Sequence, residues 1–171
     1  MPHNRPDQVR DGLEPLLPRL WRFAFFLCGA RDVAEDLVQA TCLRALERAQ
    51  QFQPDTRLDR WLFAILRSVW FNELRSRRVR SGEGAVDAQT VLFVDGVARA
   101  EMNIFGRQVL AAIGSLPPAQ RETALLVYGE GYSYKEAASL TGVPIGTVMS
   151  RLAAARVALA PLGVAAKNEK D

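Results

Sequence analysis

Several polar and basic residues near the middle of the chain have the types and spacing of a surface that binds nucleic acid. Ser68, Asn72 and Arg75 follow one another at i, i+4 and i+7, which places them on one side of a helix. Asn and Ser can hydrogen-bond base edges, while Arg neutralises phosphates or stacks on bases. Trp70 and Phe71 add aromatic residues nearby, and the basic run continues with Arg77, Arg78 and Arg80. A solvated basic helix end would show the same residues, because Arg in a last turn also favours the helix dipole.

A second pattern, over Tyr134–Leu159, predicts a helix, a tight turn and another helix. Ala138 is small enough for two helices to approach, and Gly142 can adopt a left-handed backbone angle at the turn. Val143 and Val148 are spaced to seal a small core under the second helix. Such a helix-turn-helix places its second helix in a DNA major groove, so the basic helix is also interpreted as a nucleic-acid surface.

The candidate recognition helix is Ile145–Leu159. Thr and Ser can contact phosphates or bases, and Arg can reach guanine or phosphate. The residues expected to meet DNA from this motif are Lys135, Ile145, Gly146, Thr147, Ser150 and Arg151. An Ala-rich helix that only packs in a bundle is the plainer alternative.

Amphipathic helices must position the middle surface. Leu13–Leu27 predicts a first helix ending at Gly29, and Asp32 with Glu35 resembles a capping box that opens a second helix running to about Gln50. Its expected buried stripe is Val33, Leu37, Val38, Thr41 and Leu46. A polar loop with Pro54 precedes a third helix, from about Leu58 to Arg80.

The following stretch, 81–100, has no helical stripe and predicts a flexible linker. Helical patterns resume from residue 101, and Ser133 with Glu136 forms a second capping box. The fold class is therefore all-α: two small helical domains, 1–80 and 101–171, joined by a flexible linker at 81–100, with the helix-turn-helix in the second.

Composition excludes most catalytic classes. The chain has 171 residues, a formal net charge of +3 and a single histidine, His3. It has no glycine-rich phosphate loop, no His-Glu-x-x-His and no paired-cysteine motif. The acids Asp32, Glu35 and Asp36 at a helix start favour the dipole. We expect no enzyme activity, no metal, no cofactor and no small-molecule substrate. The polar N-terminus and the lack of any stretch near eighteen apolar residues predict a cytoplasmic protein without membrane insertion.

In this order, the segments resemble a bacterial sigma factor of the extracytoplasmic-function (ECF) group. The resemblance covers region 2, about Leu13–Arg80, and region 4, about Ile104–Leu159. The matching strings are Asp32-Val33-Ala34-Glu35-Asp36-Leu37-Val38-Gln39, Trp61-Leu62-Phe63-Ala64-Ile65, Leu116-Pro117-Pro118 and Gly146-Thr147-Val148-Met149-Ser150-Arg151-Leu152.

The resemblance implies specific roles for these residues. The second helix would dock on the clamp coiled coil of core RNA polymerase through Asp32, Glu35, Asp36, Gln39 and Arg44. The loop and the third helix would open the minus-ten promoter element, flip a base and hold the single strand, through Gln53, Asp55, Arg57, Arg67, Ser68, Asn72, Arg75, Arg77 and Arg78. The recognition helix would read the minus-thirty-five element as duplex.

The function implied is promoter recognition, promoter melting and transcription initiation. Core RNA polymerase, promoter DNA and an anti-sigma factor are the implied partners. A stand-alone helix-turn-helix regulator is the competing hypothesis. It would dimerise on paired half-sites, but it leaves Leu13–Arg80 without a role.

Overall fold

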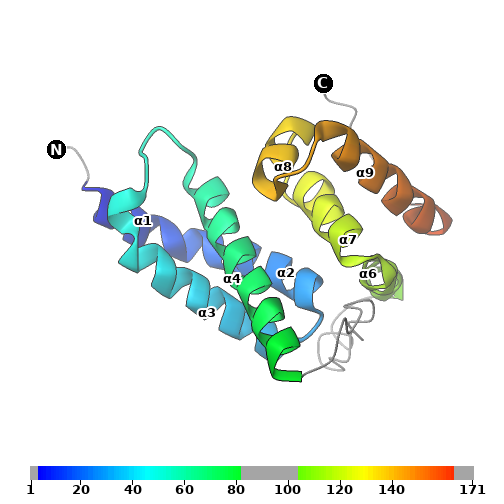
Figure 1. Ribbon diagram of the computed structural model, residues 1–171, viewed down its shortest axis with the longest axis horizontal. Coiled ribbons are helices and arrows are strands. Elements are labelled where there is room, and N and C mark those ends of the chain that lie inside the picture. The colour runs from blue at the N-terminus through cyan, green and yellow to red at the C-terminus, as the bar shows by residue number, and fades with distance from the viewer. Residues whose placement is uncertain (1–3, 82–103, 164–171) are drawn as a thin grey trace. The chain divides into compact units, whose positions relative to one another are not determined.

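The computed structural model describes residues 4–81 and 104–163, and the elements in these two ranges are all helices (Figure 1). The predicted all-α fold is confirmed. The predicted linker, 81–100, lies outside the described residues apart from Ser81. The helices form two units, which are described separately below.

The N-terminal unit holds its hydrophobic core among helices α2, α3 and α4. Its elements are α1 (Arg5–Leu13), the 3-10 turn η1 (Glu14–Leu16), α2 (Leu17–Cys28), which belongs to this unit as far as Phe25, α3 (Arg31–Glu47), the 3-10 turn η2 (Ala49–Gln51) and α4 (Leu58–Ser81). Leu62 and Leu66 of α4 are fully buried, as is Ala34 of α3. The rings of Phe23 and Phe63 meet edge to face with centroids 5.0 Å apart. This packing fixes α3 beside α4 (Figure 1).

The start of the chain differs from the prediction. We expected one helix from Leu13, but a separate helix α1 precedes it and buries Val9 and Leu13. These two residues, four apart in a polar segment, give too weak a pattern to predict a helix. α1 is held by packing against α3 and η2. Pro15 lies in the 3-10 turn that separates α1 from α2, because proline removes a backbone donor and ends regular helix.

Helix α3 also begins differently from the prediction. It starts at Arg31, so Asp32 lies in the first turn and is not the N-cap. The Glu35 carboxylate accepts from Arg31 Nε at 3.0 Å, so an i, i+4 ion pair replaces the expected capping box. The expected buried stripe is correct for Leu37, Val38 and Thr41 but wrong for Leu46, which is 44% exposed.

The C-terminal unit is built around its last helix. Its elements are α6 (Ile104–Ser115), α7 (Pro118–Ala124), the π-helical turn η3 (Leu125–Gly129), α8 (Tyr134–Thr141), α9 (Ile145–Leu159) and the 3-10 turn η4 (Ala160–Leu162). α9 packs on α7 and α8. Val148, Leu152 and Ala155 of α9 are fully buried, at the spacing of one helix face.

The helix-turn-helix is confirmed, with one residue corrected. Ser133 Oγ accepts from Glu136 N at 3.2 Å, and Glu136 Oε2 accepts from Ser133 N at 2.8 Å, which completes the capping box of α8. Gly142 ends α8 with a φ of 70°. The small buried residue is Ala137, not Ala138. Ala138 contributes its carbonyl, which accepts from the N–H groups of Gly142 and Val143.

The last helix corrects a further expectation. Within the described ranges, Ile145–Leu162 is one helical stretch long and apolar enough to cross a membrane by length and composition, although we expected none. One such helix is weak evidence, since the core helix of a soluble protein passes the same test. Val148, Leu152 and Ala155 face the unit's own core, and Arg151 and Arg156 interrupt the run.

Candidate nucleic-acid and polymerase interfaces

The loop before α4 is anchored at both ends. At its start, Phe52 packs against Trp61 with ring centroids 5.4 Å apart. At its end, Asp59 is buried and accepts from Arg57 Nη2 at 2.8 Å and from Arg19 Nη1 at 3.2 Å. Between these anchors Gln53 and Asp55 are exposed. The contacts at the two ends of the loop therefore hold its predicted DNA-binding residues at the surface.

The carboxylate of Asp59 is held in its charged form. Burial acts to raise its pKa, but hydrogen bonds from Arg57 and from the backbone N–H of Arg60, together with the Arg57 charge and a bond from Arg19, outweigh burial and lower the pKa. Arg57, predicted to contact the minus-ten element, is therefore also a structural ion-pair partner within the chain.

The predicted row on α4 lies on the surface. Ser68, Asn72 and Arg75 are all exposed, so no core encloses them. The Arg67 guanidinium carbon lies 4.6 Å from the centroid of the Phe71 ring, which keeps a cation and an aromatic ring together on this helix. Trp70, which we expected to add aromatic surface, is buried and belongs to the core.

The end of α4 is less uniformly positive than its sequence suggests. Arg77 Nε donates to Glu73 Oε1 at 2.8 Å, an exposed i, i+4 pair that offsets part of its charge. The side chain of Arg78 lies outside the description. Of the predicted minus-ten residues on this helix, Arg75 is the exposed arginine nearest to Asn72 in sequence.

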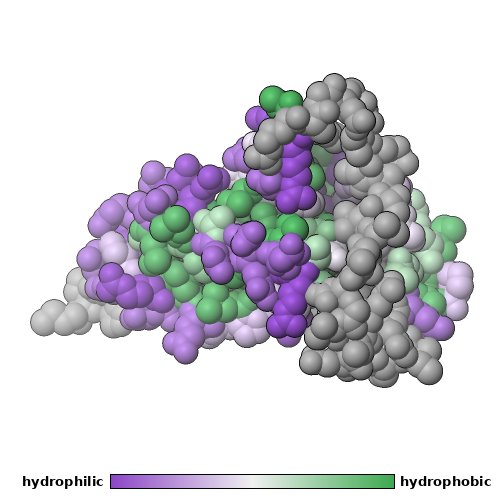
Figure 2. Space-filling model, turned by 90° about the horizontal axis from the view of Figure 1, so that it is seen from below, coloured by the Kyte–Doolittle hydropathy of each residue, from purple (hydrophilic) through white to green (hydrophobic). Residues whose placement is uncertain are grey.

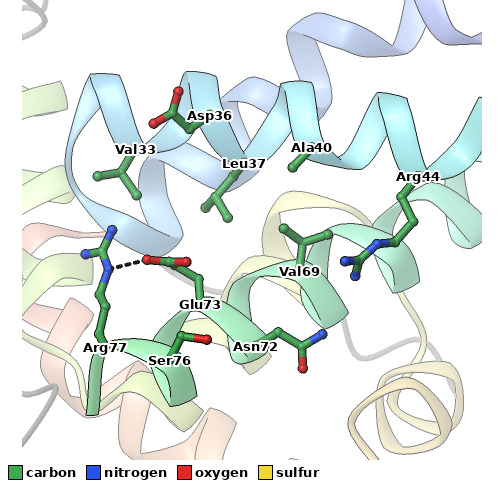
Figure 3. Close-up of a pocket in the computed structure, with 10 residues that line it drawn as sticks. All are labelled: Val33, Asp36, Leu37, Ala40, Arg44, Val69, Asn72, Glu73, Ser76 and Arg77. Atoms are coloured by element: carbon green, nitrogen blue, oxygen red, sulfur yellow. Dashed lines mark hydrogen bonds and ion pairs between the residues drawn. The ribbon is translucent and has the colours of Figure 1, made fainter. Parts of the chain in front are cut away.

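A groove of about 320 Å³ runs between α3 and α4 (Figure 3). Apolar side chains, including Leu37 and Val69, line it together with polar ones. It brings Asp36 and Arg44, predicted to face polymerase, alongside Asn72 and Arg77, predicted to face DNA. In Figure 3 the Arg44 side chain extends from α3 toward the α4 side of the groove. The two predicted surfaces are thus neighbours on one unit.

The outer face of α3 carries the predicted polymerase residues. Asp32, Glu35, Asp36 and Gln39 are all exposed, and Arg44 is half-buried. The same face continues into two leucines for which no surface role is predicted. They are Leu43, 60% exposed, and Leu46.

These leucines complete a regular stripe on α3. The spacing alternates between four and three over Asp32, Asp36, Gln39, Leu43 and Leu46, which is the heptad spacing of a seam that packs on another helix. Viewed from below, the N-terminal unit shows apolar residues in green among hydrophilic ones in purple (Figure 2). The spacing can be read from the sequence, but Leu46 was expected in the buried stripe and Leu43 was given no role.

The residues predicted to meet DNA from α8 and α9 are mostly open to solvent. Lys135, Ile145, Gly146 and Ser150 are exposed, whereas Thr147 and Arg151 are half-buried. The Ser150 hydroxyl donates to the Thr147 carbonyl at 3.0 Å. Met149, which we did not predict as a contact, is 52% exposed on the same part of the helix.

This arrangement offers exposed groups suited to binding. In residues 4–81 and 104–163, His, Cys, Asp and Glu form no group that could hold a metal ion. The described surface offers arginine and amide side chains on α4 and a helix-turn-helix formed by α8 and α9. Together they define a DNA-binding transcription protein.

Comparison with known families agrees. The family described as "Sigma-70 region 2" matches residues 13–80, and "Sigma-70, region 4" matches residues 106–159. The chain is 40% identical to the ECF RNA polymerase sigma factor EcfG of Rhodopseudomonas palustris. The match covers 91% of this chain and 85% of that protein. It is 36% identical to the ECF RNA polymerase sigma factor SigC of Mycobacterium tuberculosis, over 82% of this chain and 75% of that protein.

Solved structures show the same architecture. The sigma factor RpoE of Bartonella quintana, in complex with the anti-sigma factor NepR, has a TM-score of 0.71 and 32% identity, covering 90% of this chain and 94% of that one. CnrH, solved with the cytosolic domain of CnrY, has a TM-score of 0.62 at 24% identity, covering 92% and 94% of the two chains, and supports the fold. The chain belongs to the ECF RNA polymerase sigma factors, which are transcription initiation factors. None of these matches is to a class of membrane-spanning proteins.

Proposed function

We propose that this sigma factor directs core RNA polymerase to promoters by gripping one DNA at two elements. In this proposal α4 and the loop before it open the minus-ten element, and α9 holds the minus-thirty-five element as duplex. The observation that carries the proposal is the exposed row Ser68, Asn72 and Arg75, in the same chain as a complete helix-turn-helix. The corresponding modules are 1–80 and 101–171, joined by a linker at 81–100.

The opening step requires binding energy rather than covalent chemistry. Flipping a base from the stack costs a few kcal/mol. Asn72 and Ser68 offer hydrogen-bonding groups to unpaired bases, and Arg75 offers a charge to the phosphate backbone. Phe71 lies beside this row with Arg67 over its ring, a surface suited to stacking. The factor itself then acts as a binding subunit, without enzymatic activity, cofactor or small-molecule substrate.

Polymerase binding is assigned to the outer face of α3. Asp32, Glu35, Asp36 and Gln39 present acids and an amide to the partner, and Arg44 lies at the groove that leads to α4. The heptad spacing of this face fits a helical surface such as the clamp coiled coil. Because α3 and α4 pack together, docking α3 would set the position of the DNA-binding row.

An anti-sigma factor is proposed as a further partner. The Bartonella quintana relative was solved with such a factor, NepR, and the likeness to that chain extends over both units. We propose that an anti-sigma factor holds this chain inactive, and that both partners meet it in the cytoplasm.

The test is transcription in vitro with purified core RNA polymerase and a promoter library from the source genome. We expect specific starts when the chain is added to core, and weak DNA binding by the chain alone. A tight, two-fold symmetric footprint without polymerase, combined with no specific starts, would instead establish a stand-alone regulator. Nothing in the described units favours that second function.

A further inference from the structure

We propose that α9 reads thymine methyl groups in the duplex through Ile145 and Met149. This inference rests on the proposed function, and it assigns to Met149 a specificity role beside the predicted contact Ile145. Both are large apolar side chains left half exposed, at 49% and 52%, whereas Val148, Leu152 and Ala155 of the same helix are fully buried.

The two residues occupy one line on the helix. Ile145 and Met149 are four residues apart, so their side chains lie on the same face, about 6 Å apart along the axis. They fall in the first turns of the second helix of the motif, the part that contacts base edges in a helix-turn-helix. The rise of about 3.4 Å per base pair means that they would meet positions about two base steps apart.

Gly146, Ser150 and Ala153 offer little direct base readout. Gly146 has no side chain, and a Cβ placed there would meet nothing within 4 Å, so the surface is open at this point. The Ser150 hydroxyl proton is donated to the Thr147 carbonyl. Ala153, one turn beyond Met149, is exposed but short. Ile145 and Met149 are therefore the large exposed side chains along this line of the helix.

The groups displayed in the major groove indicate what this apolar pair would contact. Among the groups displayed there, the C5-methyl of thymine is the one that apolar side chains contact. Lys135, Ser150 and Arg151 supply polar and basic groups around the apolar pair, which suits a surface flanked by phosphates. If the apolar pair instead bound an apolar surface of another protein, these polar and basic neighbours would have no role. The exposed row also continues to Val157, 76% exposed and three turns from the start of the helix, where no base contact is expected.

The experiment is a uracil-interference assay on a promoter found in the transcription screen. Thymines are replaced at random by deoxyuridine, which removes only the methyl group, and promoter complexes with the holoenzyme are separated from free DNA. We expect depletion of uracil at thymines of the minus-thirty-five element about two base pairs apart. The loss per methyl should be about threefold to fivefold in binding.

Variants assign the contacts. Ile145→Ala and Met149→Ala should each abolish interference at one thymine, and Val157→Ala, the matched exposed control on the same helix, should keep the wild-type pattern. Unchanged circular dichroism and melting temperature would show that the variants are folded. Interference that is absent from this element, or that persists in both variants, while the holoenzyme still binds and starts transcription, would overturn the methyl readout and leave the proposed function intact. Failure of the wild-type holoenzyme to bind or start at any promoter would instead refute the proposed function.

Discussion

Leu43 provides a quantitative test of the polymerase interface, because its exposure separates binding from folding. It is 60% exposed on α3, one helical turn after the predicted contact Gln39. Full burial of a leucine side chain contributes about 1.5–3 kcal/mol. The exposed part can therefore still contribute about 1–2 kcal/mol on docking, and truncation to alanine should remove about 1 kcal/mol of it.

The expected result of Leu43→Ala is a dissociation constant for core RNA polymerase about fivefold higher. Adding Leu46→Ala, at a residue 44% exposed, should raise the total to about tenfold to twentyfold. Fluorescence anisotropy with labelled sigma factor and purified core measures both. The free protein should keep its free energy of unfolding within about 0.5 kcal/mol.

Two controls make the result interpretable. Met149→Ala truncates a side chain of similar exposure on α9, the helix proposed to contact DNA, and should leave core binding unchanged. Leu37→Ala, at a residue 3% exposed on the inner face of α3, should cost about 2–5 kcal/mol of folding stability. If Leu43→Ala binds core as tightly as the wild type, the stripe is not a docking surface. If it unfolds like Leu37→Ala, the exposure argument itself is wrong.

Three further predictions address DNA binding, the loop anchor and the turn. Arg75→Ala should weaken promoter binding across sequences and reduce the slope of log K against log salt by about one unit, measured by titration of the holoenzyme, and an unchanged slope would exclude a phosphate contact. Asp59→Asn should cost about 1–3 kcal/mol at pH 7. Since the folded pKa of Asp59 is lowered, the contribution of its carboxylate to folding stability is complete above the unfolded pKa of about 3.9 and is lost as pH falls through the folded value. The denaturant curves of variant and wild type should therefore converge in acid. A difference that stays constant with pH would show that the charge is not the cause. Gly142→Ala places a Cβ at a φ of 70° and should lower stability by about 1–2 kcal/mol, detectable as a lower melting temperature, whereas an unchanged or higher value would contradict a strained turn.

The fold could be predicted where local chemistry and periodicity agree. The sequence places α9 at its observed bounds and α4 to within one residue, because each combines a clear start with a sustained apolar stripe. The capping box at Ser133 and the left-handed Gly142 also follow from local rules. The helix α1 could not be predicted, since Val9 and Leu13 are its only buried apolar residues and the helix is stabilised by packing on α3.

The candidate site was predictable in position but not in detail. Exposure of Ser68, Asn72 and Arg75 follows from their offset from the buried stripe. The ion pair between Arg57 and Asp59 depends on how the loop closes, which spacing does not determine. Leu46 was wrongly placed in the core because periodicity reports apolar character and not which apolar residues a neighbouring helix covers.

The proposal that α4 opens the minus-ten element while α9 holds the minus-thirty-five element is tested most directly by the permanganate reactivity of thymines in the minus-ten element. The reactivity is measured in complexes with core RNA polymerase. Wild-type sigma factor should make these thymines reactive only when core is present. The variant carrying Ser68→Ala, Asn72→Ala and Arg75→Ala should remain bound at the minus-thirty-five element and leave them paired. Equal reactivity with the triple variant would contradict strand opening by α4, as would wild-type levels of transcription from the triple variant.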